Sequence, residues 1–167
     1  ILVACGENTT KTPTAQAIID KAISVSGGEL YENSNFRFDF RDKSYVLERN
    51  NGQKVLKRIS ITDTATIVDV KELNKFRRFV NDSLIVVPDS LARKYGNSIN
   101  SVHYFAYLPY GLNDKAVNKE LLGTTTIKDI AYYKVKVSFD QQGGGDDFED
   151  IYIYWFNKET FKPDYLA

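Results

Sequence analysis

The sequence predicts a protein of the α+β class, with an antiparallel sheet and helices set to one side of it. Two segments show the apolar period of a helix, whereas most of the remaining chain alternates in the manner of strands. The 167 residues include eleven Tyr, ten Phe and one Trp, a composition typical of β-rich proteins. The predicted order is one helix, about six strands, a second helix and about four strands. Strands grouped in runs favour antiparallel pairing.

Residues 14–26 are predicted to form the first helix. Thr14 is a suitable N-cap after Pro13, and Gly27 with Gly28 is suited to the C-terminal end. Five apolar residues recur at helical spacing and predict a stripe that packs on the sheet. They are Ala15, Ile18, Ile19, Ala22 and Ile23.

Six strands are expected between residues 35 and 87. The first alternates, with Phe36, Phe38 and Phe40 on one face. Asn51-Gly52 is a strong hairpin signal, and Asn81-Asp82 marks a second hairpin. The expected strands are 35–40, 45–49, 54–61, 65–70, 75–80 and 83–87. Residues 71–75 also fit the start of a short helix.

A second helix is predicted over residues 89–108, with Asp89 as its cap and Pro109 as its end. Its C-terminal half is apolar almost all round, which indicates burial on more than one side. Residues 113–122 are expected to form one or two further helical turns. Strands are then expected at 124–130, 132–139, 148–157 and 161–167.

The hairpin formed by residues 132–139 and 150–157 organises the C-terminal half of the predicted fold. Residues 140–149 between the two strands form a glycine-rich acidic loop. The second strand is apolar on both faces, so both faces should be covered. A helix, a lid or a ligand therefore lies over this sheet.

The N-terminal residues resemble a bacterial lipobox, Leu2-Val3-Ala4-Cys5. This resemblance implies that Cys5 becomes the acylated N-terminus and anchors the protein to a membrane. Cys5 is the single cysteine of the chain, and an incidental cysteine in a terminal tail is the alternative interpretation. Residues 1–13 are thus expected to be a lipobox remnant and polar tether, and residues 14–167 a single domain. The last strand has no stop signal, so we expect the domain to continue beyond Ala167.

The complete pattern resembles the LolA/LolB-like proteins and, more closely, an uncharacterised family of predicted lipoproteins from Bacteroidota. The resemblance implies an antiparallel sheet curved into an open half-barrel, with helices over its concave face. It also implies a place in the bacterial envelope, where proteins of this fold carry or accept lipoprotein acyl chains, but it implies no enzymatic activity. The stretches that carry it are 25–29, 38–41, 87–90, 108–114, 139–145, 148–150 and 157–160.

An aromatic set on the second helix and the late strands is the candidate ligand site. Such residues are typical of an apolar cavity with a few polar groups, although plain core packing is the slightly favoured explanation. The proposed lining residues are Tyr104, Phe105, Tyr107, Leu108, Tyr133 and Trp155, with Tyr110 and Phe156 beside them.

Other motifs favour no chemistry. His103 lacks a partner at a diagnostic spacing and is expected to be a hydrogen-bonded, half-buried histidine. The acidic residues of loop 140–150 do not match a calcium motif, so a solvated loop is expected over a metal site. The cationic residues near 54–58 and 75–78 are expected on solvated strand faces, with anionic headgroups as an alternative.

These observations predict a non-catalytic envelope lipoprotein that binds an apolar ligand or an acyl chain. The sequence contains no GxSxG, HExxH, cysteine pair or phosphate loop, and it predicts no cofactor and no metal. Zero net charge gives no support for nucleic-acid binding. The alternative is a surface or periplasmic interaction module with a filled core, which binds a protein or a glycan.

Overall fold

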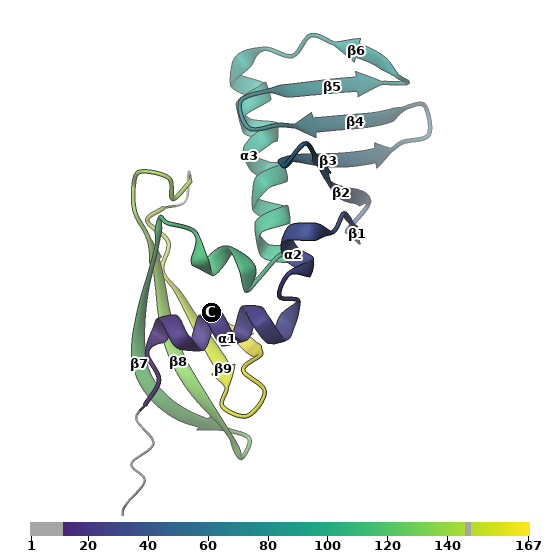
Figure 1. Ribbon diagram of the computed structural model, residues 1–167. Helices are drawn as coiled ribbons and strands as arrows, with labels where there is room; N and C mark the ends of the chain where they lie inside the picture. The colour runs from purple at the N-terminus through teal and green to yellow at the C-terminus, as the bar shows by residue number, and fades with distance from the viewer. Residues whose placement is uncertain (1–11, 146–147) are drawn as a thin grey trace, which may run out of the picture.

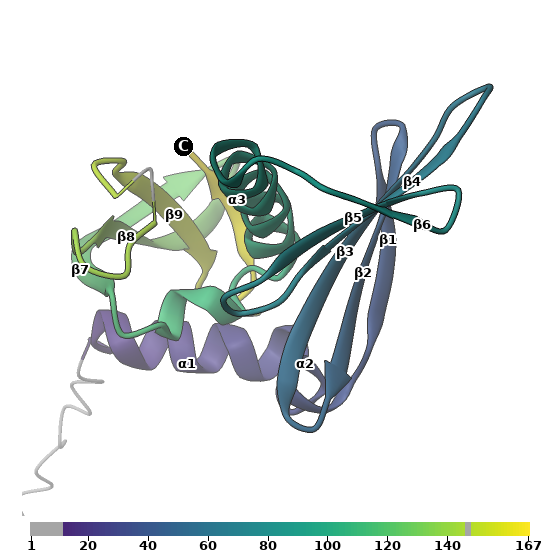
Figure 2. The ribbon, with the colours of Figure 1, turned by 90° about the horizontal axis from the view of Figure 1, so that it is seen from above.

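The computed structural model describes residues 12–145 and 148–167, which form two antiparallel sheets and a small set of helices (Figure 1). Strands β1–β6 form a six-stranded meander, and the second sheet has the order β10-β9-β8-β7. Seen from above, helix α3 lies between the two sheets (Figure 2). The helices are α1 (Ala15–Ser26), α2 (Leu30–Asn33), α3 (Asp89–Ala106) and the 3-10 helix η1 (Tyr110–Asn113).

The six-stranded sheet confirms the strands expected before the second helix. Its strands are β1 (Phe36–Phe40), β2 (Lys43–Asn50), β3 (Gln53–Ile61), β4 (Thr66–Lys71), β5 (Phe76–Val80) and β6 (Ser83–Ile85). Both predicted hairpins are present. Asn51 and Gly52 have φ of 50° and 78°, and Asn81 and Asp82 have φ of 46° and 64°. Successive positive φ values give the turn that matches strand twist, and Asn, Asp and Gly tolerate them best.

The four-stranded sheet follows α3. It contains β7 (Val117–Ile127), β8 (Ile130–Phe139), β9 (Tyr152–Asn157) and β10 (Pro163–Leu166). The expectation of helical turns at 113–122 was wrong, because residues from Val117 onward pair along β8 from Val117–Phe139 to Ile127–Ile130. Lys119, Glu120 and Leu121 are good helix formers, yet a ladder along the whole of β8 outweighs that local preference.

Two further expectations are corrected. Asp89 is not the N-cap of α3; it is the first helical residue, Pro88 occupies the cap position, and no side chain caps this end. The strands do not form one continuous curved sheet. Strand β6 is short and ends at Ile85, and Pro88 then prevents further strand pairing before α3. The sheet that contains β7 begins separately after α3.

Helix α1 packs its predicted stripe against the four-stranded sheet. Thr14 caps the helix as expected, because its hydroxyl accepts a hydrogen bond from the Ala17 amide at 3.1 Å. Burial of each large apolar side chain contributes roughly 1.5–3 kcal/mol, so this contact holds the helix to the sheet. The buried residues of this core are Ala15, Ile18, Ile19, Ala22, Leu112, Val117, Tyr133, Val135, Val137, Tyr154 and Phe156.

Helix α3 is attached to the six-stranded sheet through a buried ionic cluster. Asp69 on β4 is 2% exposed and lies between its register partners Arg58 and Arg78. Its carboxylate oxygens accept hydrogen bonds from Arg58 Nη2 and Arg78 Nε, each at 2.7 Å. The Arg78 guanidinium lies 4.1 Å from the ring centroid of Tyr95 on α3, and Arg58 Nη1 donates to Ser98 Oγ at 3.2 Å. The cluster therefore joins three strands to the helix.

No helix in the described ranges is both long and apolar enough to span a bilayer.

We predict that Asp69→Ala lowers the free energy of unfolding by about 3–5 kcal/mol, because it leaves two guanidinium groups without their carboxylate in a largely buried site. Denaturant unfolding followed by circular dichroism measures the change. Asp63→Ala, in the exposed turn after β3, is the matched control and should change stability by less than about 0.5 kcal/mol. Equal effects of the two substitutions would contradict this role of Asp69.

Candidate functional site

A cavity of about 400 Å³ lies between α3 and one end of the four-stranded sheet. Residues from Asn97 to Phe105 on α3 form one wall. The opposite wall comes from the start of β7, the end of β8 and the start of β9, and Gly143 to Gly145 lie at its rim. This volume falls in the range of small-molecule sites, roughly 300–1,000 Å³.

Four aromatic rings in this cavity form a closed cycle. Tyr104 and Phe105 come from α3, Phe139 from the end of β8 and Tyr152 from the start of β9, and all four line the cavity. Each ring contacts two of the others edge to face. The centroid distances are 5.9 Å for Tyr104–Phe105, 6.0 Å for Phe105–Tyr152, 6.1 Å for Phe139–Tyr152 and 6.4 Å for Tyr104–Phe139.

Polar groups occupy the remaining wall. Along α3, the amides and hydroxyls of Asn97, Ser98, Asn100 and Ser101 line the cavity. The hydroxyl of Tyr104 is buried and has no hydrogen-bond partner. Burial raises the pKa of Tyr104 to about 12, so this phenol is a neutral donor at physiological pH. A buried donor without a partner at a cavity indicates a place where a ligand or water oxygen is accommodated.

The glycine-rich loop after β8 approaches the cavity closely because Gly144 has no side chain. A Cβ atom at this position would overlap the carbonyl oxygen of Asp140 and come within 2.9 Å of the side chains of Phe139 and Phe148. Gly143 has φ of 92°, a conformation that other residues rarely adopt. The glycines therefore allow the loop to fold back over the end of β8.

The structure brings together two of the six residues proposed from the sequence. Tyr104 and Phe105 line the cavity as expected. Tyr107 does not, because it packs in a separate cluster under α2, with its ring centroid 5.8 Å from that of Tyr31. Leu108 and Tyr133 belong to the core beneath α1. For these last three residues, plain core packing is the observed role.

Trp155 lies on the opposite face of the four-stranded sheet. Its strand neighbours Tyr154 and Phe156 are fully buried in the core. Because successive side chains of a strand point to opposite faces, the side chain of Trp155 points away from that core. The ammonium group of Lys134, its register partner, lies 5.7 Å from the Trp155 ring. The proposal that Trp155 lines the cavity is therefore wrong.

Sequence reasoning missed Phe139, Tyr152 and Val117 as cavity residues. The signal was partly present, since Phe139 shares its predicted face with Tyr133, Val135 and Val137. The pairing of Val137 with Tyr152 places Phe139 beside Tyr152. That register is not readable from the sequence of two strands joined by a long loop.

His103 is buried against the six-stranded sheet and does not line the cavity. Its ring makes edge contacts with Phe38 and Tyr45, at centroid distances of 5.5 and 5.7 Å. Its Nε2 lies 3.4 Å from the carbonyl oxygen of Lys57. The histidine is therefore more deeply buried than expected, at 3% exposure, and burial lowers its pKa below the usual value near 6.5.

We predict that His103 makes the folded state sensitive to mild acid. The unfolded chain takes up this proton more readily, so the stabilisation is complete above pH 6.5 and is lost as the pH falls from 6.5 through the lower pKa of the folded state. Because His103 is the single histidine, unfolding free energies between pH 7 and 5 should fall more steeply in the wild type than in His103→Leu. The extra slope is at most about 1.4 kcal/mol per pH unit. Parallel profiles would contradict the prediction.

Two sequence hypotheses fall on residues outside the described ranges. Cys5, the proposed lipidation site, is one, and Asp146 with Asp147 of the acidic loop is the other. Among the residues that are described, no group of three or more His, Cys, Asp or Glu side chains is arranged to hold a metal ion.

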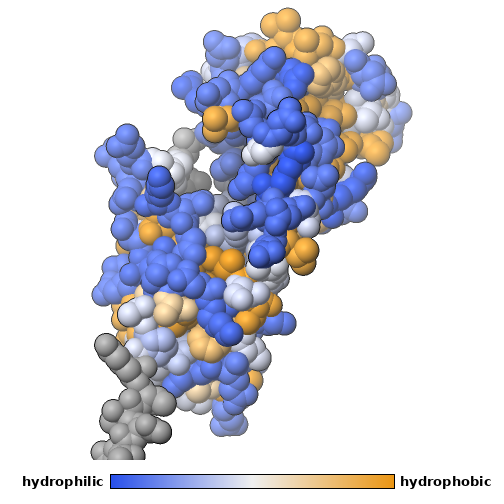
Figure 3. All heavy atoms as spheres, in the orientation of Figure 1, coloured by the Kyte–Doolittle hydropathy of each residue, from blue (hydrophilic) through white to orange (hydrophobic). Residues whose placement is uncertain are grey.

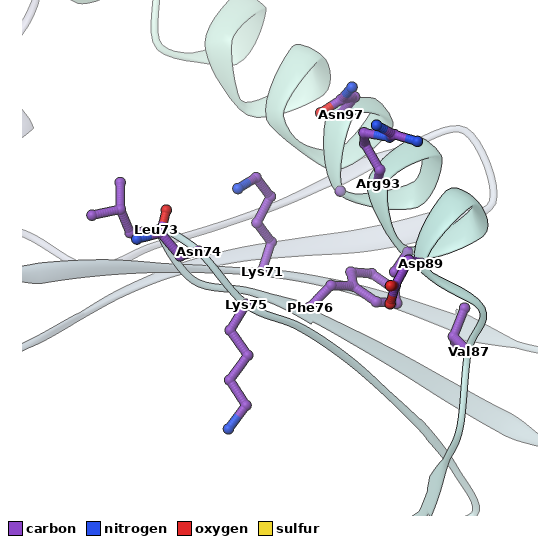
Figure 4. A pocket seen from close by; sticks show the side chains of 11 residues that line it. Lys71, Leu73, Asn74, Lys75, Phe76, Val87, Asp89, Arg93 and Asn97 are labelled. Atoms are coloured by element: carbon purple, nitrogen blue, oxygen red, sulfur yellow. The ribbon is translucent and has the colours of Figure 1, made fainter.

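A second hollow of about 440 Å³ lies between the β4–β5 turn and the first turns of α3 (Figure 4). Lys71, Lys75 and Arg93 line it together with Asp89. In the close view Lys75 extends away from the helix, whereas Lys71 points toward it. Because the cations do not converge on one point, this hollow is a weaker candidate than the aromatic cavity.

The whole chain, residues 1–167, matches the model of DUF6503, a family of unknown function. The chain belongs to this family. A search of curated proteins found no match. Among solved structures, the chain is similar to a LolA superfamily protein from Nitrosomonas europaea, with a TM-score of 0.52 and 16% sequence identity. The alignment covers 91% of this chain and 70% of the other. At this identity the likeness concerns the fold, which agrees with the predicted LolA-like class.

Proposed function

We propose that this DUF6503 protein is a non-catalytic, membrane-anchored binding protein of the bacterial envelope that holds an apolar ligand or a lipoprotein acyl chain. The observation that carries the proposal is the cavity between α3 and the four-stranded sheet, with Tyr104, Phe105, Phe139 and Tyr152 as its aromatic wall. The similarity to a LolA superfamily structure supports it at the level of the fold alone.

Apolar burial supplies the binding energy in this proposal. Each CH₂ group transferred from water to an apolar wall contributes roughly 0.8 kcal/mol, so a short segment of alkyl chain is sufficient for measurable affinity. The serine and asparagine side chains of α3 then orient the polar end of the ligand. An apolar wall with a few polar groups is the usual arrangement of a ligand pocket.

The curved four-stranded sheet with α1 laid across it is the part of the molecule that corresponds to a half-barrel in this proposal (Figure 1). Helix α3 meets one end of this sheet, and the cavity forms where the helix approaches the ends of β7, β8 and β9. Acylation of Cys5 would keep the domain at the outer membrane or its periplasmic face, within reach of lipid ligands.

The chemistry of the lining residues supports binding over catalysis. Among the described residues, the titratable ones that line the cavity are Tyr104, Tyr152 and Asp114. The raised pKa of Tyr104 keeps it protonated, so it is a poor base near pH 7. Nucleophilic catalysis requires an activated group beside a base, and in the part of the chain that the structure describes the lining residues contain no serine–histidine or cysteine–histidine pair.

We predict that the purified Cys5→Ser protein, which cannot be acylated at this position, carries a stoichiometric lipid or fatty acyl species, detected by mass spectrometry of its organic extract. Phe105→Arg places a charge in the cavity wall and should remove this species. It should also weaken the binding of the methyl ester of cis-parinaric acid, a fluorescent uncharged acyl chain, by about tenfold or more.

Phe40→Arg is the matched control, because Phe40 and Phe105 are similarly exposed, at 45% and 44%, and Phe40 does not line the cavity. This variant should bind as the wild type does. A folded Cys5→Ser protein with an empty extract and no affinity for the methyl ester of cis-parinaric acid would contradict the proposed function.

A second candidate function, an interaction module for a protein or glycan partner, is favoured by a different surface. Ile59, Val68, Phe79 and Leu84 are register partners on β3 to β6, and they form an apolar row on the sheet face opposite α3. Leu84 is 62% exposed. Figure 3 shows hydrophobic residues gathered at the end of the molecule formed by β5 and β6. Exposed apolar patches of this kind mark interaction sites.

This second candidate required a filled core beneath α3, whereas a cavity is observed there. The two functions can be distinguished by crosslinking in intact cells. A photoreactive residue is placed at position 79 in one variant and at position 105 in another, and the adducts of the two variants are compared. A protein or glycan adduct from position 79 alone favours the interaction module, and a lipid adduct from position 105 favours the binding protein.

A further inference from the structure

The four rings line the same cavity and contact one another in a cycle. Their centroids form a closed quadrilateral with sides between 5.9 and 6.4 Å. An aromatic face attracts a cation that lies within ~6 Å of its centroid. Cages of several aromatic rings are the arrangement by which proteins bind alkylated ammonium groups.

The charge of the lining residues has the sign that such a ligand requires. Asp114 is the lining residue that carries charge, and neither lysine nor arginine lines the cavity within the described ranges. A second carboxylate lies close, since Asp150 Oδ2 accepts a hydrogen bond from the Tyr152 hydroxyl at 3.0 Å. This hydrogen bond places a second carboxylate beside the Tyr152 ring.

Arg58, Lys119 and Lys54 lie near the cavity without lining it. Arg58 reaches Ser98, a lining residue, through its Nη1 atom at 3.2 Å. Its other nitrogens donate to Asp69 on the sheet side of the helix. Lys119 Nζ donates to Gln16 on α1 at 2.9 Å. Burial raises the pKa of Asp114, and the charges of Lys54 and Lys119 act in the opposite direction. An anionic ligand would therefore meet a carboxylate and aromatic faces with no free cation among the lining residues.

We propose that the aromatic cage formed by Tyr104, Phe105, Phe139 and Tyr152 binds an alkylammonium group, with Asp114 as its counter-ion. The inference rests on the proposed function and names the headgroup of its ligand: an amphiphile whose polar end is a substituted ammonium. The same chemistry is present in a choline-type lipid headgroup and in a free choline-like amine. The lipid carries a long alkyl chain, whereas the free amine does not.

Isothermal titration of the full chain with ligands of equal chain length tests the headgroup directly. Dodecyltrimethylammonium and dodecyl sulfate, each below its critical micelle concentration, share the alkyl chain and differ in charge. The cage predicts at least tenfold tighter binding of the ammonium compound. Choline and its uncharged carbon analogue 3,3-dimethylbutanol repeat the comparison without a long chain, and choline should bind more tightly.

Substitutions identify the site. Phe105→Leu keeps an apolar side chain but removes one aromatic face, and it should weaken dodecyltrimethylammonium binding about tenfold while changing dodecyl sulfate binding little. Phe105→Tyr retains the face and should retain the affinity. Phe40→Leu, a similarly exposed phenylalanine away from the cavity, is the control. Asp114→Asn should weaken the ammonium ligand selectively.

The outcomes separate this inference from the function on which it rests. Equal affinity for the ammonium and sulfate amphiphiles would overturn the cage and leave an apolar binding site. Binding of choline with no gain from the dodecyl chain would support the cage and contradict the acyl-binding function. Tight binding of dodecyltrimethylammonium, weakened by Phe105→Leu and restored by Phe105→Tyr, supports both. No binding of any of these ligands would overturn both.

Discussion

The pairing of Asp69 with Arg58 and Arg78 is the interaction on which the rest of the molecule depends. Helix α3 contacts both sheets. One side of the helix packs on the six-stranded meander, and the other side forms a wall of the cavity. A cavity wall is useful only when its position is fixed. Tyr95 and Ser98 fix the helix to the two guanidinium groups, and a single buried carboxylate holds both guanidiniums in place.

The cavity follows from the way in which the two sheets are joined. Since β6 and β7 do not pair, the chain crosses from one sheet to the other through α3 and η1. Helix α1 fills the near face of the four-stranded sheet with aliphatic side chains, whereas α3 meets the end of that sheet with rings. The aliphatic side chains fill the interface between α1 and the sheet. At the interface between α3 and the sheet, the large aromatic rings contact one another at their edges and leave a cavity. The same rings offer apolar area to an alkyl chain and electron-rich faces to a cation.

Local chemistry determines which parts of this structure the sequence predicts. The cap at Thr14 and the turns at Asn51-Gly52 and Asn81-Asp82 depend on neighbouring residues alone, and all three were predicted correctly. Residues 113–122 were predicted incorrectly because pairing with β8 overrides their helical preference. For the cavity, Tyr104 and Phe105 follow from the helix period. Phe139 and Tyr152 depend on strand register and on where α3 crosses the sheet, which no local pattern encodes.

Photo-crosslinking with the methyl ester of a diazirine-bearing fatty acid, an uncharged acyl chain, tests most directly whether the cavity is the binding site. After irradiation of the full chain, peptide mass spectrometry locates the covalent adducts. The account predicts adducts on the cavity segment of α3, residues 97–105, and at Phe139 or Tyr152. Adducts confined to the opposite face of the six-stranded sheet, at Ile59, Val68, Phe79 or Leu84, would contradict it and assign the apolar ligand to the exposed row.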